Sequence, residues 1–479
     1  MDNKKFNIDD AKAKLAEITE SFIHEAYFEN VDETENRLAE LAEKSKKSSY
    51  IDPELYTKYD VKRGLRDVNG RGVLVGITDI SEVCSTKVVD GKRIPIDGEL
   101  YYRGYNVRDI IKKSRDADHF GFEECTYLLL FGELPDTRDL AEFQNLLGDY
   151  RSLPKNFTRD VIMKKPSRDI MNSLSRSVLT LYSYDDNADD TSPVNVLRQS
   201  LQLISMFPLL SVYGYQAYRH YHKDGSLIIH RPRPELSTAE NILHLLRDDS
   251  KYTQLEAKLL DVALILHMEH GGGNNSTFTT HLVSSSGTDT YSAIAAALGS
   301  LKGPKHGGAN IKVVKMFADM KENVKDWTSE EEVGAYLEAL LNKEAFDKAG
   351  LIYGMGHAIY TLSDPRAVIL KEYAGNMAIG TEYEREYHLL EAIERLTPLI
   401  FEEIKHSSKV MCANIDMYSG VVYRMLGIPE ELFTPLFAVS RMAGWCAHRF
   451  EEINSGKRII RPAYKSVSHE KKYVDIKDR

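Results

Sequence analysis

Helical periodicity dominates the chain from about residue 106 onward. Apolar side chains recur there at spacings of three and four residues, which is typical of amphipathic helices. The predicted helices span residues 120–131, 138–150, 169–182, 194–220, 238–248, 254–269, 288–301, 309–321, 329–342, 366–374, 381–405 and 430–453. The pattern therefore predicts a mainly all-α fold.

Two of these segments, 258–268 and 291–301, are apolar on nearly every face, and the second is rich in Ala, Gly and Ser. Such segments pack closely inside a deep core.

The N-terminal part predicts a charged helical arm. Residues 8–46 have the pattern of two amphipathic helices, with Leu15 and Ile18 at helical spacing in the first, and Leu38 and Leu41 at the end of the second. We expect an appended arm or a dimer contact.

Residues 62–105 have a different pattern, in which apolar and polar positions alternate. Turn pairs stand at Asp90 and Gly91 and again at Asp97 and Gly98. This region therefore predicts a short β-meander near the N-terminus, and it is the only convincing strand region.

Composition narrows the possible partners. The chain has 479 residues, a formal net charge of −10 and 42% hydrophobic residues, which is ordinary globular usage. The negative charge argues against a nucleic-acid surface but permits a local basic pocket for an anionic substrate. The acidic loop 183–193 is expected to be exposed and to serve as a connection or a partner contact rather than in chemistry.

Cysteine usage and hydropathy indicate a cytoplasmic protein. The four cysteines are scattered without a C-x-x-C pair, so neither a zinc site nor a disulfide framework is predicted. The amino terminus has no signal-peptide pattern, and nowhere do eighteen apolar residues follow one another. We expect no membrane span.

Candidate chemistry is concentrated in two histidines that are bracketed by glycines. His306 stands in GPKHGGAN just before a predicted helix, whose dipole favours a neutral imidazole that can donate to an enolate. His357 follows Gly354-Met-Gly356, which would let it point into a cavity. For His306 the alternative is a buried structural histidine. A dinucleotide-binding loop fits His357 poorly because the third glycine is missing.

Asp416 is a candidate general base. It stands in the apolar stretch VMCANIDMYSGVVYRMLG, where desolvation makes a carboxylate a stronger base. The alternative is a helix N-cap or a buried hydrogen-bond acceptor. Together, Asp416 and the two histidines could polarise a carbonyl and remove a proton from carbon.

His270, in HMEHGGG, is a candidate ligand-binding histidine, and His267 one turn earlier is expected to be structural. The spacing is not that of a zincin, and no G-x-S-x-G elbow accompanies the HGGG, so metalloprotease and lipase chemistry are excluded. Arg366, Arg441 and Arg461 are candidate carboxylate clamps, which together suit a dianion. Arg366 alone would more often be a surface salt bridge, whereas the neighbours of Arg441 are apolar.

Taken together, these motifs resemble those of the citrate synthases. The resemblance rests on ordered motifs over roughly residues 65–465: GELYYRGYNVRDI, FEECTYLLLFGELP, HMEHGGGNNSTFTTHLVSSSGTD, GPKHGGAN, GMGHAIYTLSDPRA, NIDMYSG, AVSRMAGWCAHRFE and IIRPAY. Several such motifs in order are specific, where any one would be weak.

The resemblance implies condensation of acetyl-CoA with oxaloacetate, followed by hydrolysis of citryl-CoA. His306 would stabilise the acetyl-CoA enolate, His357 would hydrogen-bond the ketone, and Asp416 would remove the methyl proton. The oxaloacetate-binding positions would be His270, His357, Arg366, Arg441 and Arg461. Acetyl-CoA enters as a substrate, with no cofactor and no metal.

The resemblance also implies a two-lobed homodimer in which Arg461 reaches the site of the partner subunit. The large domain would comprise residues 1–306, including the arm at 1–60, together with 422–479. Residues 307–421 would form a small domain that closes over the substrate.

The coenzyme-binding residues are unassigned. At the fourth position after His357 the chain has Thr361, where many relatives carry a basic residue. Two alternative functions stay open: a 2-methylcitrate synthase that uses propionyl-CoA, and a non-catalytic helical scaffold that keeps the fold.

Overall fold

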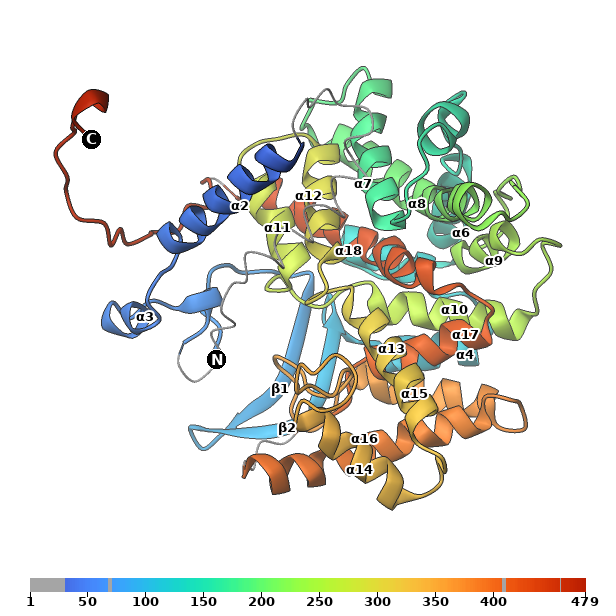
Figure 1. The fold of residues 1–479 in the computed structure, drawn as a ribbon. Coiled ribbons are helices and arrows are strands. Elements are labelled where there is room, and N and C mark those ends of the chain that lie inside the picture. Colours follow the sequence, from blue (N-terminus) through green and yellow to red (C-terminus); the bar gives the residue numbers. More distant parts are fainter. Residues whose placement is uncertain (1–30, 68–70, 407–410, 457) are drawn as a thin grey trace. The chain divides into compact units, whose positions relative to one another are not determined.

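The computed structural model describes residues 31–67, 71–406, 411–456 and 458–479, and the chain forms two compact units, residues 1–76 and residues 77–479. Helices make up most of the described residues (Figure 1). The mainly α fold is therefore confirmed. The first predicted helix of the arm, with Leu15 and Ile18, lies outside the described residues.

The first unit contains the second predicted helix of the arm, α2 (Val31–Ser48), and the short helix α3 (Glu54–Lys58). Leu38 and Leu41 on α2 are each about half exposed. The described residues therefore cover only about half of each of these two side chains.

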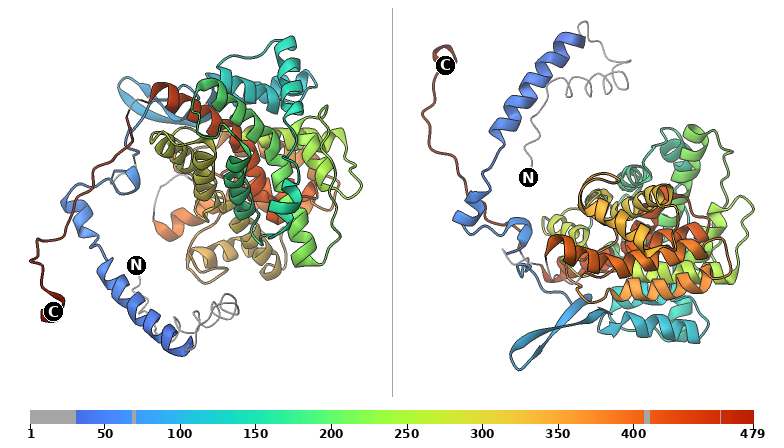
Figure 2. Two further views of the ribbon diagram at one scale, coloured as in Figure 1. Left: turned by 90° about the horizontal axis from the view of Figure 1, so that it is seen from above. Right: turned by 60° about the horizontal axis from the view of Figure 1, so that its bottom comes forward.

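The second unit opens with a small antiparallel sheet of order β1-β2-β3. Its strands are β1 (Ser81–Val89), β2 (Lys92–Tyr102) and β3 (Tyr105–Asn106). Asp90 and Gly91 join the first two strands with φ angles of 51° and 74°, as a tight hairpin turn requires. The hairpin extends from one side of the helical body (Figure 2). The predicted meander and its first turn are confirmed.

The second predicted turn is wrong, because Asp97 and Gly98 lie inside β2. The backbone N–H of Gly98 donates to the carbonyl oxygen of Ser363 at 3.1 Å, and a Cβ at this position would lie 2.2 Å from that oxygen. Glycine is needed here for a close approach between two backbones rather than for a turn. The strand region is also shorter than predicted, since the described residues before β1 contain no strand of the sheet.

Helices follow the sheet to the end of the body. They are α4 (Val107–Asp116), α5 (Phe122–Phe131), α6 (Thr137–Asp149), α7 (Ile170–Leu181), α8 (Pro193–Lys223), α9 (Thr238–Leu246), α10 (Gln254–His267), α11 (Asn275–Ser284), α12 (Thr290–Lys302), α13 (Ala309–Asn323), α14 (Glu330–Leu341), α15 (Pro365–Ala378), α16 (Glu384–Lys405), α17 (Asp416–Met425) and α18 (Phe433–Ser455). Every helix predicted beyond residue 106 is present within a few residues.

Three helices, α4, α11 and α17, were not predicted. In α11 the reason is composition, because its Ser and Thr residues give no apolar stripe and such residues favour caps and turns. Thr279 and Thr280 instead donate their hydroxyls to carbonyls one turn earlier. Burial against neighbouring helices outweighs the weak local preference.

The core is built around α18, which packs against α8, α11, α10 and α5. Figure 1 shows α11, α12 and α18 close together in the upper part of the body. The two segments predicted to lie deep in the core correspond to α10 and α12, and their apolar side chains are buried. The core therefore surrounds the segments that carry the candidate residues.

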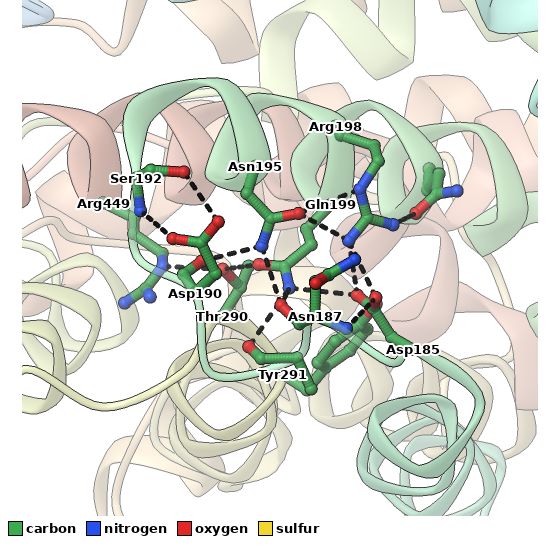
Figure 3. A network of polar contacts seen from close by, with 12 residues as sticks. Asp185, Asn187, Asp190, Ser192, Asn195, Arg198, Gln199, Thr290, Tyr291 and Arg449 are labelled. Carbon is green, nitrogen blue, oxygen red and sulfur yellow. Dashed lines mark hydrogen bonds and ion pairs between the residues drawn. The ribbon is translucent and has the colours of Figure 1, made fainter.

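The acidic loop 183–193 is exposed at most of its positions, as predicted, but it also contributes to a polar network. The side chain of Asp185 is only 8% exposed and pairs with Arg198 at 2.7 Å, and Tyr291 donates its hydroxyl to the same carboxylate at 2.8 Å. The network continues through Gln199 to α12 and α18 (Figure 3). The loop fastens the start of α8 to two core helices.

Among the described residues, no helix combines the length and the apolar character needed to cross a bilayer. The predicted small domain, residues 307–421, lies within the second unit. The boundary between a large and a small domain, and any motion between them, stay predictions.

Candidate active site

The loop that carries His357 is pinned to the loop before α17. Gly356 donates its N–H to the carbonyl oxygen of Cys412 at 2.8 Å, and Asn414 donates its N–H to that of Gly354 at 2.9 Å. The Asn414 side chain adds a hydrogen bond of 3.0 Å to the Gly356 carbonyl. Gly354 and Gly356 have φ angles of 85° and 87°, a region that favours glycine. The two glycines therefore allow a short backbone bridge between two segments far apart in sequence.

The surroundings of His357 set its tautomer. Its Nδ1 accepts hydrogen bonds from the backbone N–H groups of Ile359 and Tyr360, both at 3.0 Å. A neutral ring must then carry its proton on Nε2. The ring stacks on Tyr360 with a centroid separation of 4.7 Å. His357 is thus oriented as a hydrogen-bond donor through Nε2.

Asp416 is the first residue of α17 and is only partly exposed. Burial raises its pKa to about 6, although the nearby Arg366 acts in the opposite direction. The predicted desolvation is confirmed. The N-cap alternative is not realised, because Ile415 occupies that position. The carboxylate is therefore a stronger base than an exposed aspartate and is still mostly ionised at neutral pH.

His306 lies in the turn before α13, as predicted. Its Nε2 is 3.0 Å from the hydroxyl of Ser276, which also accepts a hydrogen bond from Trp445 at 3.2 Å. Burial lowers the pKa of His306 to about 4, and Arg441 acts in the same direction. The ring is therefore neutral at physiological pH, chiefly because it is buried. Its hydrogen bond goes to a hydroxyl and not to backbone carbonyls, the predicted structural alternative.

His270 lies against the His357 ring. The two ring centroids are 5.0 Å apart, and Tyr360 lies 5.6 Å from His270. His270 is buried, and its Nε2 has no hydrogen-bond partner among the described residues. His267 instead binds the carbonyl of Ala263 at 2.7 Å through Nδ1, which suits the structural role predicted for it.

Arg366 is the second residue of α15 and is held by the residue that caps this helix. Asp364 is the N-cap, and its carboxylate accepts two hydrogen bonds from the guanidinium at 3.0 and 2.7 Å. Both side chains are buried. Burial acts against the charged form, but the Asp364 carboxylate raises the pKa of Arg366 well above its usual value. One edge of this arginine is therefore fixed by its neighbour.

Arg441 lies fully buried on α18. Its Nε donates to the carbonyl of His267 at 2.8 Å, and its guanidinium lies 4.8 Å from the ring centre of Phe437. Its two terminal nitrogens have no hydrogen-bond partner among the described residues. Burial lowers its pKa to about 10, so the group still carries its charge at neutral pH. An uncompensated buried cation of this kind is complementary to an anionic ligand.

The fold brings six of the seven predicted residues into one cluster, of which His270, Arg366 and Arg441 are buried and the others are partly buried. His270 lies within electrostatic reach of Arg366, His357, Arg441 and His306, and their charges add to burial in holding its pKa well below the usual value. Arg366 likewise acts on Asp416.

The seventh residue, Arg461, is exposed in the extended segment after α18. Within a single chain it is not part of the cluster. Its predicted place in the site of a partner subunit stays a prediction.

Sequence reasoning missed the side chains that orient the cluster, above all Ser276 and Asn414. Nothing in the local pattern marks Ser276, which lies thirty positions before His306 and reaches it only through the packing of α11. Asn414 had a weak signal, since it stands two residues before Asp416 in NIDMYSG.

Comparisons with known proteins show the family of this chain. A family model described as "Citrate synthase, C-terminal domain" matches residues 65–463. A citrate synthase of Deinococcus radiodurans is 34% identical over 80% of this chain and 93% of its own length, and a 2-methylcitrate synthase of Shewanella oneidensis is 34% identical over 79% and 92%. One solved structure superposes on this chain with a TM-score of 0.70. That structure is the ternary complex of carboxymethyl coenzyme A and oxaloacetate with the citrate synthase of Thermoplasma acidophilum. The two sequences are 28% identical, and the match covers 88% of this chain and 99% of the Thermoplasma chain. The matches span nearly the whole body that holds the cluster, and the chain belongs to the citrate synthase family.

Proposed function

We propose that the protein is an acyltransferase that condenses acetyl-CoA with oxaloacetate and hydrolyses citryl-CoA to citrate and coenzyme A. The observation that carries this proposal is the buried guanidinium of Arg441, whose terminal nitrogens find no hydrogen-bond partner in the described part of the chain while Arg366 lies nearby. Two buried arginines in one cluster suit a substrate with two carboxylates.

Oxaloacetate would bind first. Arg441 and Arg366 would each hold carboxylate oxygens, with His270 as a further hydrogen-bond partner. The ketone oxygen would accept a hydrogen bond from Nε2 of His357, the ring nitrogen that carries the proton. This contact makes the ketone carbon more electrophilic, and it strengthens as charge develops on the oxygen.

Asp416 and His306 would activate acetyl-CoA. The Asp416 carboxylate takes a proton from the methyl carbon, and the electron pair moves toward the thioester oxygen. A neutral His306 can donate to that oxygen from Nδ1 when its Nε2 accepts the hydroxyl proton of Ser276. Charge on the thioester oxygen is then met by a preorganised donor, and the proposed reaction needs no metal.

The enolate carbon attacks the polarised ketone, and the new alkoxide takes a proton from His357. Water then adds to the thioester carbon of citryl-CoA. The carbon–sulfur bond breaks, and citrate and the coenzyme A thiol leave.

The protein would work as a homodimer that supplies Arg461 to its partner's site. Support comes from the position of Arg461, which is exposed in an extended C-terminal segment. Closure of residues 307–421 over oxaloacetate would exclude water until both substrates are bound.

Cytoplasmic localisation is part of the proposal. All four cysteines, Cys84, Cys125, Cys412 and Cys446, are free, which suits a reducing compartment.

The deciding experiment measures thiol release from acetyl-CoA with and without oxaloacetate, in the wild-type protein and in Asp416→Ala. We expect release that depends on both substrates and falls by several orders of magnitude in the variant, while oxaloacetate still binds. A protein that binds oxaloacetate but releases no thiol would instead be the non-catalytic scaffold. Near wild-type activity of the variant would remove Asp416 from the role of base.

A second candidate function is 2-methylcitrate synthesis from propionyl-CoA. It is favoured by the Shewanella oneidensis relative, whose identity to this chain matches that of the citrate synthase from Deinococcus radiodurans. One extra methylene shifts discrimination by only about 1–3 kcal/mol, so a few pocket residues decide the choice. Comparing kcat/KM for the two thioesters separates the candidates, and a preference for propionyl-CoA would overturn our choice.

A further inference from the structure

A second cluster of histidines and carboxylates lies between α11 and α18, outside the proposed reacting groups. His281 on α11 faces His448 on α18, and the nitrogens Nε2 of His281 and Nδ1 of His448 are 3.0 Å apart. Glu451 and Glu452 follow His448 on the same helix, and Glu269 belongs to the segment after α10. None of these side chains has a role in the proposed mechanism.

The outer nitrogen of each ring faces a carboxylate. His281 Nδ1 lies 2.8 Å from Glu452, and His448 Nε2 lies 3.2 Å from Glu269. Because a carboxylate favours an N–H at the nitrogen it faces, a neutral His281 carries its proton on Nδ1 and a neutral His448 on Nε2, although Nε2 of His448 has no hydrogen bond of good geometry among the described residues. The inner nitrogens then present lone pairs to each other at 3.0 Å. Two lone pairs at this distance repel unless a positive charge lies between them.

An oxygen of the Glu451 carboxylate lies near the same two ring nitrogens. Glu451 accepts the backbone N–H of Asp79 at 2.8 Å through Oε1, which fixes the orientation of the group. Its other oxygen, Oε2, is buried without a hydrogen-bond partner among the described residues and lies 3.8 Å from Nδ1 of His448. The three atoms, one each from His281, His448 and Glu451, lie within 4.8 Å of one another.

We propose that His281, His448 and Glu451 bind a divalent transition-metal cation of the zinc class. Two imidazoles and one carboxylate are a common ligand set for such ions. Glu452 and Glu269 occupy the positions of the carboxylates that orient metal-bound histidines through the opposite ring nitrogen. The proposed cation is separate from the metal-free chemistry of the reaction, because none of its three ligands is a proposed reacting group.

A proton shared by the two rings is the competing occupant. A proton between the two rings would satisfy their inner nitrogens but would leave Oε2 of Glu451 without a partner among the described residues, whereas a metal ion can bind all three atoms.

The cation would stiffen the support of His270. Glu269, the residue before it, accepts hydrogen bonds from the Gly271 N–H at 2.6 Å and from the Ser81 hydroxyl at 2.9 Å. A metal held by His448 therefore connects α11 and α18 to the loop of His270 and to the start of β1. The proposed cation therefore has a structural role.

The test is metal uptake by the full-length protein after treatment with a chelator. Equilibrium dialysis against Zn²⁺ and Co²⁺ gives the stoichiometry, and the visible spectrum of bound Co²⁺ reports its ligands. We expect one ion per chain in the wild-type protein. In Glu451→Gln and His281→Gln the dissociation constant should rise at least ~10-fold, and Glu452→Gln should weaken binding by ~10–100-fold because it acts on a ligand's orientation.

His388→Gln is the matched control. His388 is also flanked by two carboxylates, Glu384 at 3.8 Å and Glu391 at 3.1 Å, but it is more than half exposed on α16. This variant should bind Co²⁺ with the wild-type spectrum. If the wild-type protein binds no Zn²⁺ or Co²⁺, or if the Glu451 and His281 variants bind as tightly as it does, the proposal is wrong and a proton occupies the position.

Discussion

Asn414 donates its side-chain amide to the carbonyl oxygen of Gly356 at 3.0 Å, while its side-chain oxygen accepts the N–H of Asp416 at the same distance. One side chain thus sets the spacing between the residue that precedes His357 and the residue proposed as the base. In the proposed reaction, His357 acts on oxaloacetate and Asp416 acts on acetyl-CoA, and Asn414 positions both.

Replacing Asn414 with Ala should lower kcat strongly while oxaloacetate still binds. A displacement of about 1 Å between reacting groups costs on the order of 100-fold in rate. Steady-state kinetics with calorimetric titration of oxaloacetate would measure both effects. Asn342→Ala, at the exposed C-cap of α14, is the control and should leave both unchanged. If kcat falls only as far as the loss of thermal stability explains, Asn414 has a merely structural role.

Gly354→Ala should be more damaging than Gly427→Ala. Both glycines have positive φ, so each substitution pays the left-handed backbone cost of about 1–2 kcal/mol. A Cβ at Gly427 meets nothing within 4 Å, whereas at Gly354 it lies 3.2 Å from the Cα of Met417. Overpacking adds roughly 1–3 kcal/mol and displaces the start of α17. Chemical denaturation of both variants would show the difference, and equal losses of stability would contradict this account.

Arg441→Met and Arg449→Met should have opposite consequences, although both arginines are fully buried on α18. Arg449 satisfies all three of its nitrogens with Thr290, Ser284 and Thr288, so its loss should cost about 3 kcal/mol of unfolding free energy. Two nitrogens of Arg441 have no hydrogen-bond partner among the residues that the structure describes, so its removal should cost little in the ligand-free protein.

The same Arg441→Met substitution should raise KM for oxaloacetate on the order of 100-fold, because a charged hydrogen-bonded pair is lost. Urea unfolding without ligand and steady-state kinetics together separate stability from binding. A large loss of stability with unchanged KM would show that Arg441 is a structural cation.

The pH dependence of kcat/KM for acetyl-CoA should report Asp416. Burial raises its pKa to about 6, and only the carboxylate can accept a proton. Activity should therefore be full above this pKa and fall as pH decreases through it, by about tenfold per pH unit. His306, with a pKa of about 4, does not change its charge in this range. Undiminished activity down to roughly pH 5 would rule out Asp416 as a base with a raised pKa.

Local pattern was enough to predict most of the helices and the first hairpin turn. It failed where tertiary contacts outweigh local preference. The pair Asp97 and Gly98 predicts a turn, because an aspartate followed by a glycine usually forms one. In the structure, Gly98 is needed because the carbonyl of Ser363, more than 260 positions away in the sequence, approaches its backbone closely. The polar helix α11 was missed because its stability comes from packing and not from an apolar stripe.

The sequence by itself determined which chemical groups the protein has. These are histidines beside glycines, an aspartate in apolar surroundings, and arginines that can bind carboxylates. Only the tertiary structure decided their states. The tautomer of His357 depends on two backbone N–H groups, and the pKa values of Asp416 and His306 depend chiefly on burial. Both are properties of surroundings assembled from distant segments, which periodicity along the chain does not encode.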